Sequence, residues 1–186
     1  EKIGGWERIS SNTFLGICRS LHSWVTLVNL TITSVGTHLK YYLEDGGAYY
    51  DITPIRATVT LTNPFTTVSG SATVTVTDAN GGYSNGDFVT FSDASAAGGL
   101  TLNGEFQITY ATGNTYTITA ASTASSSATG GGTVTAVYQI NTGVSLESPL
   151  VGWGAGTWGE GTWGNGGAST ESLRIWSQGN FGEDLI

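Results

Sequence analysis

The chain has 186 residues and a formal net charge of −8, with 28 glycines, 3 prolines, 39% hydrophobic residues and 11% aromatic residues. This apolar content excludes a disordered chain, and no run of about 18 apolar residues is present that would cross a membrane as a helix. Turn-forming glycines together with many β-branched residues favour short strands joined by tight turns, so we expect an all-β fold.

Basic residues are confined to the two ends of the chain, because none lies between Arg56 and Arg174. The stretch between them carries only acidic charges, and a surface of this kind repels phosphate. We therefore expect no direct sequence-specific binding of nucleic acid, and, where DNA passes nearby, a lumen that does not hold it. The acidic residues of this stretch are Asp78, Asp87, Asp93, Glu105, Glu147, Glu160 and Glu171.

Cys18 is the single cysteine, which excludes an intrachain disulfide. It alternates with Phe14 and Gly16, so we expect a small buried apolar side chain rather than a reactive thiol. Methionine is absent, position 1 included, and the last residues read as a strand that stops at the end of the chain. We expect a fragment or a processed product of a longer polypeptide.

The first part of the chain, residues 1–56, has mixed charge and many aromatic residues, and it reads as a meander of short strands. Asp45-Gly46-Gly47 predicts a tight turn between the last two strands, because consecutive glycines permit positive φ. Four strands at about ten-residue spacing have the size of one propeller blade or half a sandwich. The predicted strands cover residues 13–20, 27–34, 39–43 and 49–53.

The second part, residues 57–143, shows cleaner alternation of apolar residues with threonine, as at Val74 and Val76. Strands of this pattern bury one face and expose the other to water, and about 85 such residues make one small β-barrel or sandwich. We expect this part to fold as a separate module. The low-complexity run at 120–132 reads as a mobile loop between its last two strands.

The third part, residues 144–186, opens on a glycine-rich segment in which Trp153, Trp158 and Trp163 recur every five residues. Five is the period of neither a strand nor a helix, so we expect an irregular loop. Ordering so many glycines costs backbone entropy of roughly 1–2 kcal/mol per residue, and buried indoles are the groups that offset it. After the loop, residues 173–178 and 182–186 read as a new pair of strands.

Two roles are open for the three tryptophans. We favour anchoring, in which each indole is at least half buried against its own chain or a neighbouring subunit. The alternative is that exposed rings stack on sugars or fill the pocket of a partner.

Five segments of the first and third parts form a distinctive set: Ile3-Gly4-Gly5-Trp6-Glu7, residues 34–42, Asp51-Ile52-Thr53-Pro54, the glycine-tryptophan loop, and residues 174–186. Together they resemble the N-terminal region of a family of large bacteriophage tail proteins. The resemblance spans the first and third parts in the right order. It implies a partial β-propeller in a virion protein of the lower tail, where short-tailed phages carry a propeller-bearing nozzle. It also implies contacts with other tail proteins and a homo-oligomer.

The middle part resembles a second family, the small β-barrel module first described as the first catalytic-cysteine half-domain of ubiquitin-activating enzymes. The residues that carry this resemblance include Val74-Thr75-Val76, Ser84-Asn85-Gly86-Asp87, Leu102-Asn103-Gly104-Glu105-Phe106 and Tyr116-Thr117-Ile118. The module also occurs as a decoration in phage structural proteins. Because Cys18 lies outside it, the resemblance implies shape and no chemistry. Its place in the chain suggests an insertion that leaves one blade near Arg56 and returns near Leu146.

The residues that support catalysis are few. His22 and His38 are the two histidines, and no Gly-x-Ser-x-Gly elbow, zinc-ligand spacing or phosphate loop accompanies them. Glu44, Asp45 and Asp51 lie close in sequence, but we interpret them as solvated turn residues rather than a glycosidase pair. Asp78-Ala79-Asn80 offers too few oxygen ligands for calcium and reads as a turn.

The sequence thus favours a non-enzymatic structural component of a phage tail, located in the virion and extracellular when free. We expect no catalytic residue, no cofactor and no metal, and partners among tail proteins and copies of the same chain. The alternative function is an extracellular carbohydrate-binding module or adhesin that stacks aromatic rings on host glycans. A depolymerase fragment is weaker, because no carboxylate pair stands out.

Overall fold

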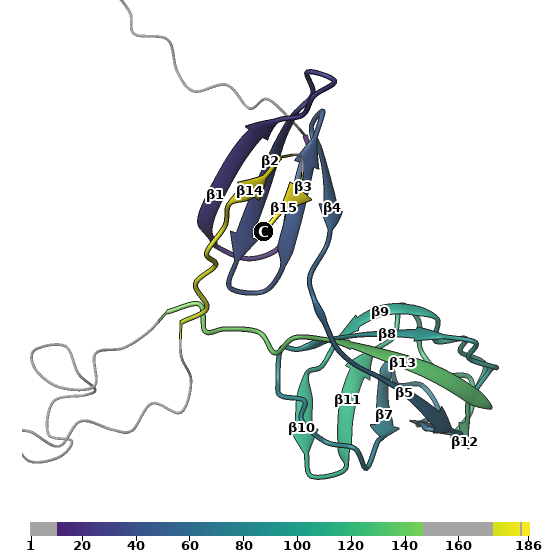
Figure 1. Cartoon of the computed structure of the whole chain (residues 1–186). Coiled ribbons are helices and arrows are strands. Elements are labelled where there is room, and N and C mark those ends of the chain that lie inside the picture. The colour runs from purple at the N-terminus through teal and green to yellow at the C-terminus, as the bar shows by residue number, and fades with distance from the viewer. Residues whose placement is uncertain (1–10, 147–172, 183) are drawn as a thin grey trace, which may run out of the picture. The chain divides into compact units, whose positions relative to one another are not determined.

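The computed structural model describes residues 11–146, 173–182 and 184–186. These residues form antiparallel β-strands (Figure 1), and the all-β fold predicted from the sequence is confirmed. No helix in the described ranges has the length and apolar character to cross a membrane. The chain divides into two compact units, one made of residues 1–52 and 143–186 and the other of residues 53–142. The boundaries predicted from the sequence are residues 56 and 143, and the assignment of the outer parts to propeller blades stays a prediction.

The first unit contains a four-stranded meander in which each strand pairs with the next (Figure 1). The turn between the last two strands is as expected, because Asp45 pairs with Ala48 across Gly46 and Gly47, whose φ angles are 56° and 88°. Two successive positive φ values are what a two-residue hairpin turn requires. The strands are β1 (Cys18–Val25), β2 (Thr31–Thr37), β3 (Tyr41–Asp45) and β4 (Ala48–Asp51).

The first hairpin corrects the predicted strand positions. Residues 13–17, predicted to be strand, precede β1, and residues 27–30 belong to the turn between β1 and β2. Two hydrogen bonds close this turn. The Leu30 N–H donates to the Thr26 hydroxyl at 3.1 Å, and the Thr26 N–H donates to the Leu30 carbonyl at 2.9 Å. Asn29 takes the left-handed conformation, with φ of 63°. The turn uses threonine and asparagine rather than glycine or proline, which is why the sequence pattern did not reveal it.

The C-terminal strands are also shorter than predicted. β14 (Asn180–Phe181) pairs with β15 (Asp184–Leu185), whereas residues 173–179 form no strand. Their contacts with the meander are described with the candidate site below.

The second unit consists of two antiparallel sheets around one core (Figure 1). One has the strand order β10-β11-β7-β6-β12 and the other β5-β13-β8-β9. The described strands do not close into a barrel, so the module is an open two-sheet arrangement. Its strands are β5 (Ile55–Thr62), β6 (Phe65–Thr67), β7 (Thr73–Thr77), β8 (Phe88–Ser92), β9 (Gly104–Gln107), β10 (Tyr110–Thr112), β11 (Thr115–Thr119), β12 (Ala128–Gly130) and β13 (Thr133–Gln139).

The alternation read from the sequence sets the core of this module. Apolar residues at alternate positions of β7, β11 and β13 point inward and are almost fully buried, while the threonines between them face outward. The inward residues of these strands are Val74, Val76, Tyr116, Ile118, Val134, Ala136 and Tyr138.

The low-complexity run at 120–132 is not the loop without fixed partners that we expected. It contains β12, which pairs with β6, and Ala124 is 2% exposed in the module core. The Ser125 N–H donates to the Gly98 carbonyl at 2.8 Å, and the Thr67 hydroxyl donates to the Ser126 carbonyl at 3.0 Å. Small polar residues here meet the backbone of neighbouring segments, an outcome that composition alone does not predict.

The two ends of the module lie side by side. β5 and β13 pair along their length, and beyond the strands the Ile140 N–H donates to the Pro54 carbonyl at 3.0 Å. A domain whose ends are adjacent fits into a chain as an insertion without separating the residues that flank it.

Three tyrosines and one aspartate form a buried polar network inside the module. The Tyr138 hydroxyl donates to Asp78 Oδ2 at 2.7 Å and lies 2.7 Å from the Tyr116 hydroxyl, while the Tyr83 hydroxyl donates to the Asp78 carbonyl at 2.8 Å. All four residues are at most 8% exposed. Burial raises the pKa of both Tyr116 and Tyr138 above the ordinary value, so both are neutral donors at physiological pH.

Replacing Tyr138 by Phe is expected to lower the free energy of unfolding of the module by roughly 1–3 kcal/mol, because Asp78 Oδ2 and the Tyr116 hydroxyl lose their shared partner. Thermal or denaturant melting of the full chain measures this change. Tyr110→Phe is the matched control, since Tyr110 is 59% exposed. Equal melting of the two variants would contradict a stabilising role for the network.

Candidate functional site

The three tryptophans predicted to anchor a loop or an interface, Trp153, Trp158 and Trp163, lie outside the described residues. Their role stays a prediction. Within the described residues, the polar side-chain contacts with the longest sequence separations, 125–158 residues, lie in the first unit, where residues 173–180 lie against the meander.

Trp176 is the centre of this contact. Its ring stacks on that of Tyr41, with 4.6 Å between ring centroids and 15° between planes, and its Nε1–H donates to the Thr37 carbonyl at 2.8 Å. The guanidinium carbon of Arg174 lies 5.6 Å from the indole centroid. Stacking, a satisfied indole N–H and a nearby cation together fix the position of this ring.

Gly36 makes the approach of Trp176 possible. A Cβ at position 36 would lie 2.5 Å from Cδ1 of the indole, closer than real side chains come, and it would also collide with the Ser20 hydroxyl. Any larger residue would push the indole off the sheet. The glycine is thus required by close packing on β2 and not by its backbone angles.

A row of polar contacts continues from Trp176 toward β1. The carboxamide of Gln178 accepts from the Ser34 hydroxyl and donates to the Ser20 hydroxyl. Asn180 Oδ1 lies 3.1 Å from Nε2 of His22, whose ring stacks on Trp24. We name this set of contacts, from Trp176 to Asn180, the C-terminal clasp.

Residues 143–145 attach to the same meander. The Gly143 N–H donates to the His38 carbonyl at 2.7 Å. Nη2 of Arg19 donates to the Val144 and Ser145 carbonyls, at 3.0 and 2.8 Å. The first unit therefore holds both the residues that follow the module and those near the end of the chain.

His38 serves this packing and is 8% exposed. Its Nδ1 accepts the Ile17 N–H at 2.9 Å, so the remaining proton of the neutral ring sits on Nε2. Burial lowers the pKa of His38, and the Arg19 and Arg174 guanidinium groups lower it further. Nδ1 is the unprotonated nitrogen that a catalytic base would use, and here it accepts the Ile17 N–H of the segment before β1.

The acidic residues near the β3–β4 turn have different roles. Glu44 Oε1 accepts the Gly47 N–H at 2.7 Å, as expected of a turn residue. Asp51 differs from the prediction, because its Oδ2 lies 2.5 Å from Nζ of Lys40, which is 2% exposed. A buried ammonium requires such a partner, so the position of Lys40 explains why Asp51 is not simply a solvated carboxylate.

The two buried aspartates of the module also act in structure. Asp78 completes the tyrosine network and accepts the Asn80 N–H at 2.8 Å, which forms the predicted turn. Asp87 is 1% exposed and accepts from the Ser84 N–H, the Asn141 side chain and the Thr142 N–H at 2.7–2.8 Å. Asp87 thereby ties the Ser84–Asp87 turn to the end of the module.

Cys18 is exposed, which corrects the prediction of a buried side chain. It stands at the start of β1, where the register shifts between Cys18 and Ser20, and this irregularity breaks the alternation from which burial was inferred. Within the described ranges, no group of three or more His, Cys, Asp or Glu side chains lies together as a metal site would require.

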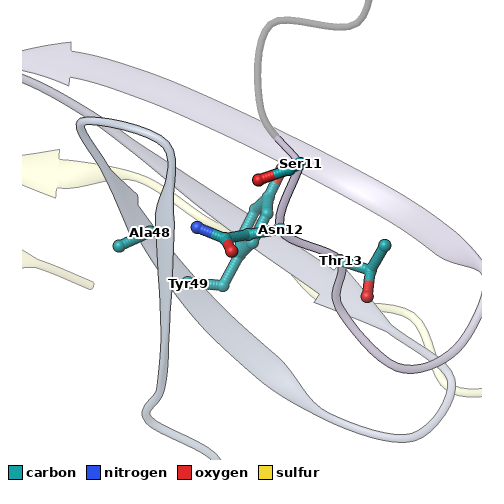
Figure 2. Close-up of a pocket in the computed structure, with 5 residues that line it drawn as sticks. All are labelled: Ser11, Asn12, Thr13, Ala48 and Tyr49. Carbon is teal, nitrogen blue, oxygen red and sulfur yellow. The ribbon is translucent and has the colours of Figure 1, made fainter.

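A shallow pocket lies beside the β3–β4 hairpin (Figure 2), lined by Ser11, Asn12, Thr13, Ala48 and Tyr49. The lining is neutral and mostly polar, with hydroxyls, one carboxamide and one phenol ring. The Tyr49 ring packs edge-on against Phe14 with 5.2 Å between centroids. These groups suit hydrogen bonds and ring stacking with a neutral ligand, and they include no carboxylate, histidine or cysteine.

No protein-family model matches the chain, and no curated protein matches it. Among solved structures, the chain is similar to the endosialidase of phage phi92, at 23% sequence identity and a TM-score of 0.40. The match covers 67% of this chain and 17% of that protein, so this chain spans under a fifth of its length. A likeness of this size carries no argument about function.

Trp176→Ala is expected to destabilise the first unit by about 3–5 kcal/mol, the usual cost of removing a packed aromatic side chain. The stability of the module should change by less, at most about 2 kcal/mol, because its core contains no residue of the clasp and only its chain ends are attached to the first unit. Ile175→Ala is the matched control, since Ile175 is 78% exposed. Hydrogen exchange of β2 and β3 amides locates the effect, and unaltered protection there in Trp176→Ala would contradict the clasp.

His38 also predicts a pH dependence. Because its pKa is lower in the folded chain than the ordinary 6.5, the unfolded chain binds more protons as pH falls through 6.5. The stabilisation from neutral His38 is therefore complete above about pH 7 and is lost as pH falls from 6.5 toward the lowered pKa.

His38→Gln, which keeps an acceptor for the Ile17 N–H, is expected to flatten this loss between pH 7.5 and 5. Urea melting of the first unit at several pH values measures the slope. The module contains no histidine, so its own pH dependence is the internal control. An equally steep slope in wild type and variant would rule out His38 as its origin.

Proposed function

We propose that this chain is a non-enzymatic structural component of a bacteriophage tail that holds neighbouring tail subunits. The observation that carries the proposal is where the family-resembling segments lie. Residues 34–42 and 174–178 are far apart in sequence, yet they contact one another around Trp176, and Lys40 in the first of these segments pairs with Asp51.

The contacts between these segments are specific rather than incidental. Trp176 meets Thr37 and Tyr41, Gly36 is small where the indole approaches, and Lys40 pairs with Asp51. The family-resembling residues that the structure describes are thus among those that assemble the first unit. A sequence likeness that coincides with one packed unit supports a shared structure, and the structural role is carried over from the family by analogy.

The module at 53–142 fits the same proposal as a decoration. Its ends meet at Pro54 and Ile140, and its most buried carboxylates, Asp78 and Asp87, hold its own loops and tyrosines. A unit of this kind adds surface to a virion protein without altering the unit that carries it. We further propose, by analogy with short-tailed phages, a nozzle-like position in the tail and a homo-oligomeric assembly.

A second candidate function is the binding of neutral host glycans, as in a carbohydrate-binding module or adhesin. The pocket of Figure 2 favours it, because Asn12, two hydroxyl side chains and Tyr49 offer the hydrogen bonds and ring that sugars use. The two functions are compatible in a tail protein, but they predict different results.

Immunogold labelling of intact particles with antibodies against the purified chain tests the proposed function. Label is expected at the tail, and label confined to the capsid, or absent from particles, would contradict it. The purified chain is also expected to release no sugar from a polysaccharide panel and no product from ester substrates. Turnover that disappears on changing one acidic residue would show an enzyme instead.

Retention of the chain on immobilised polysaccharides separates the two candidates. The structural role predicts no retention, and the glycan-binding role predicts retention that Tyr49→Ala weakens. A variant with Trp153, Trp158 and Trp163 all changed to Ala tests the other possible stacking site. Loss of incorporation into particles with unchanged glycan retention would support the anchoring role of these tryptophans.

A further inference from the structure

The outer edge of β1 is not paired in the described part of the chain. The sheet order β1-β2-β3-β4 places β1 at one end, with hydrogen-bonded partners on the β2 side only. Open edges recruit other strands unless a protein protects them with charges, prolines or bulges. β1 has a charged residue and a register shift only at its start, at Arg19. Residues 20–25 contain no Asp, Glu, Lys, Arg or Pro and no register shift.

Apolar side chains are exposed along the same strand and next to it. Leu21 is 65% exposed and Val25 is 56% exposed, on the face of the sheet that also carries Val35 and Tyr42. The other exposed apolar residues between positions 15 and 30 include Leu15, Ile17, Val28 and Leu30. At roughly 100 Å² each, these six side chains expose about 600 Å², against the ~800 Å² that each partner buries in a stable interface. Backbone and polar atoms of the strand supply the remainder.

The charge pattern leaves this hairpin accessible to another acidic chain. Each copy carries a net charge of −8, yet no Asp, Glu, Lys or Arg occurs between Arg19 and Lys40. A second copy can therefore approach β1 without placing like charges opposite each other, an arrangement that destabilises paired strands.

The sequence of β1 is self-complementary about Ser23. Two β1 strands that pair antiparallel around a twofold axis at Ser23 set Leu21 opposite Val25 of the second copy, and His22 opposite Trp24. Exposed apolar residues therefore meet on the face of the sheet that carries Leu21 and Val25. This is the match that a twofold interface needs, because each contact occurs twice.

The opposite edge of the sheet is less suited to pairing. β4 has four residues against eight in β1, and it ends at Asp51, whose carboxylate is held by Lys40. Pro54, which has no N–H to donate, follows three residues later. A head-to-tail arrangement of β1 on β4 would match a long strand with a short one.

We propose that β1 is a homodimer interface, in which two copies of the chain join their meanders through antiparallel β1–β1 pairing centred on Ser23. The inference concerns the isolated chain and does not depend on its location in a virion. Failure of the labelling experiment above would leave the interface intact, and failure of the tests below would leave the tail assignment intact.

Cross-linking tests the pairing and its register in the full chain. Ser23→Cys in a Cys18→Ser background places two thiols opposite each other, at a Cα separation of about 4.5–5.5 Å that a disulfide can bridge. Mild oxidation is expected to convert this variant to a covalent dimer. Tyr50→Cys in the same background is the matched control, because Tyr50 is 57% exposed on β4. No dimer from Ser23→Cys, or an equal yield from both variants, would overturn the proposal.

Molar mass in solution tests the apolar contact. Wild-type chain is expected to show twice the mass of one chain at sufficient concentration. Leu21→Lys is expected to weaken dimerisation about 100-fold, since a tenfold loss per contact occurs twice across a twofold axis. Val68→Lys, at a 58% exposed position of the module, is the control for added charge. A wild-type chain that stays monomeric, or a dimer that Val68→Lys weakens equally, would contradict the interface.

Discussion

The first unit depends on the contact of Trp176 with a four-stranded meander that offers little core of its own. One face of that sheet receives the indole over Gly36 and Tyr41, and the glycine exists there because a Cβ would collide with the ring. Without this contact, Ser20 and Ser34 would lose Gln178, and the Thr37 carbonyl would lose its indole donor. A small sheet needs cover on its faces to be stable in water, and a segment more than 130 residues away in sequence supplies it.

The buried lysine, histidine and aspartate side chains described above have structural partners in both units. Lys40 is held by Asp51, and the Nδ1 atom of His38 is held by Ile17. In the module, Asp78 accepts from Tyr138, while Asp87 accepts from three groups in two loops. Burial of a charge or a hydroxyl costs free energy unless a partner replaces water. Each of these residues, met in sequence as a possible acid, base or ligand, has a structural task in the fold.

The sequence predicted those parts of the fold that depend on local patterns. Alternation located β7, β11 and β13, and consecutive glycines located the Gly46-Gly47 turn. It failed where the decisive partner is distant. The turn at Thr26–Leu30 has no glycine, the serine-rich run at 120–132 is held by Gly98 and Thr67, and Cys18 is exposed by a register shift. The role of Trp176 had no local signal either, because its partners in β2 and β3 are known only from the fold.

The inserted module also affects the clasp through chain entropy. Ile52 and Gly143 are both tied to the β2–β3 connection, through the Tyr41 and His38 carbonyls. If the intervening residues 53–142, about 90 in number, were unfolded, joining these points would close a long flexible loop. When the module is folded, the loop to be closed shrinks to the ~6 residues that flank Pro54 and Ile140. Each doubling of loop length costs about 0.6 kcal/mol, so closing a loop of ~90 residues instead costs roughly 2 kcal/mol more. Folding of the module brings Pro54 and Ile140 together and removes most of that cost. The coupling is reciprocal, because a folded first unit that holds Ile52 and Gly143 favours the folded module by the same free energy.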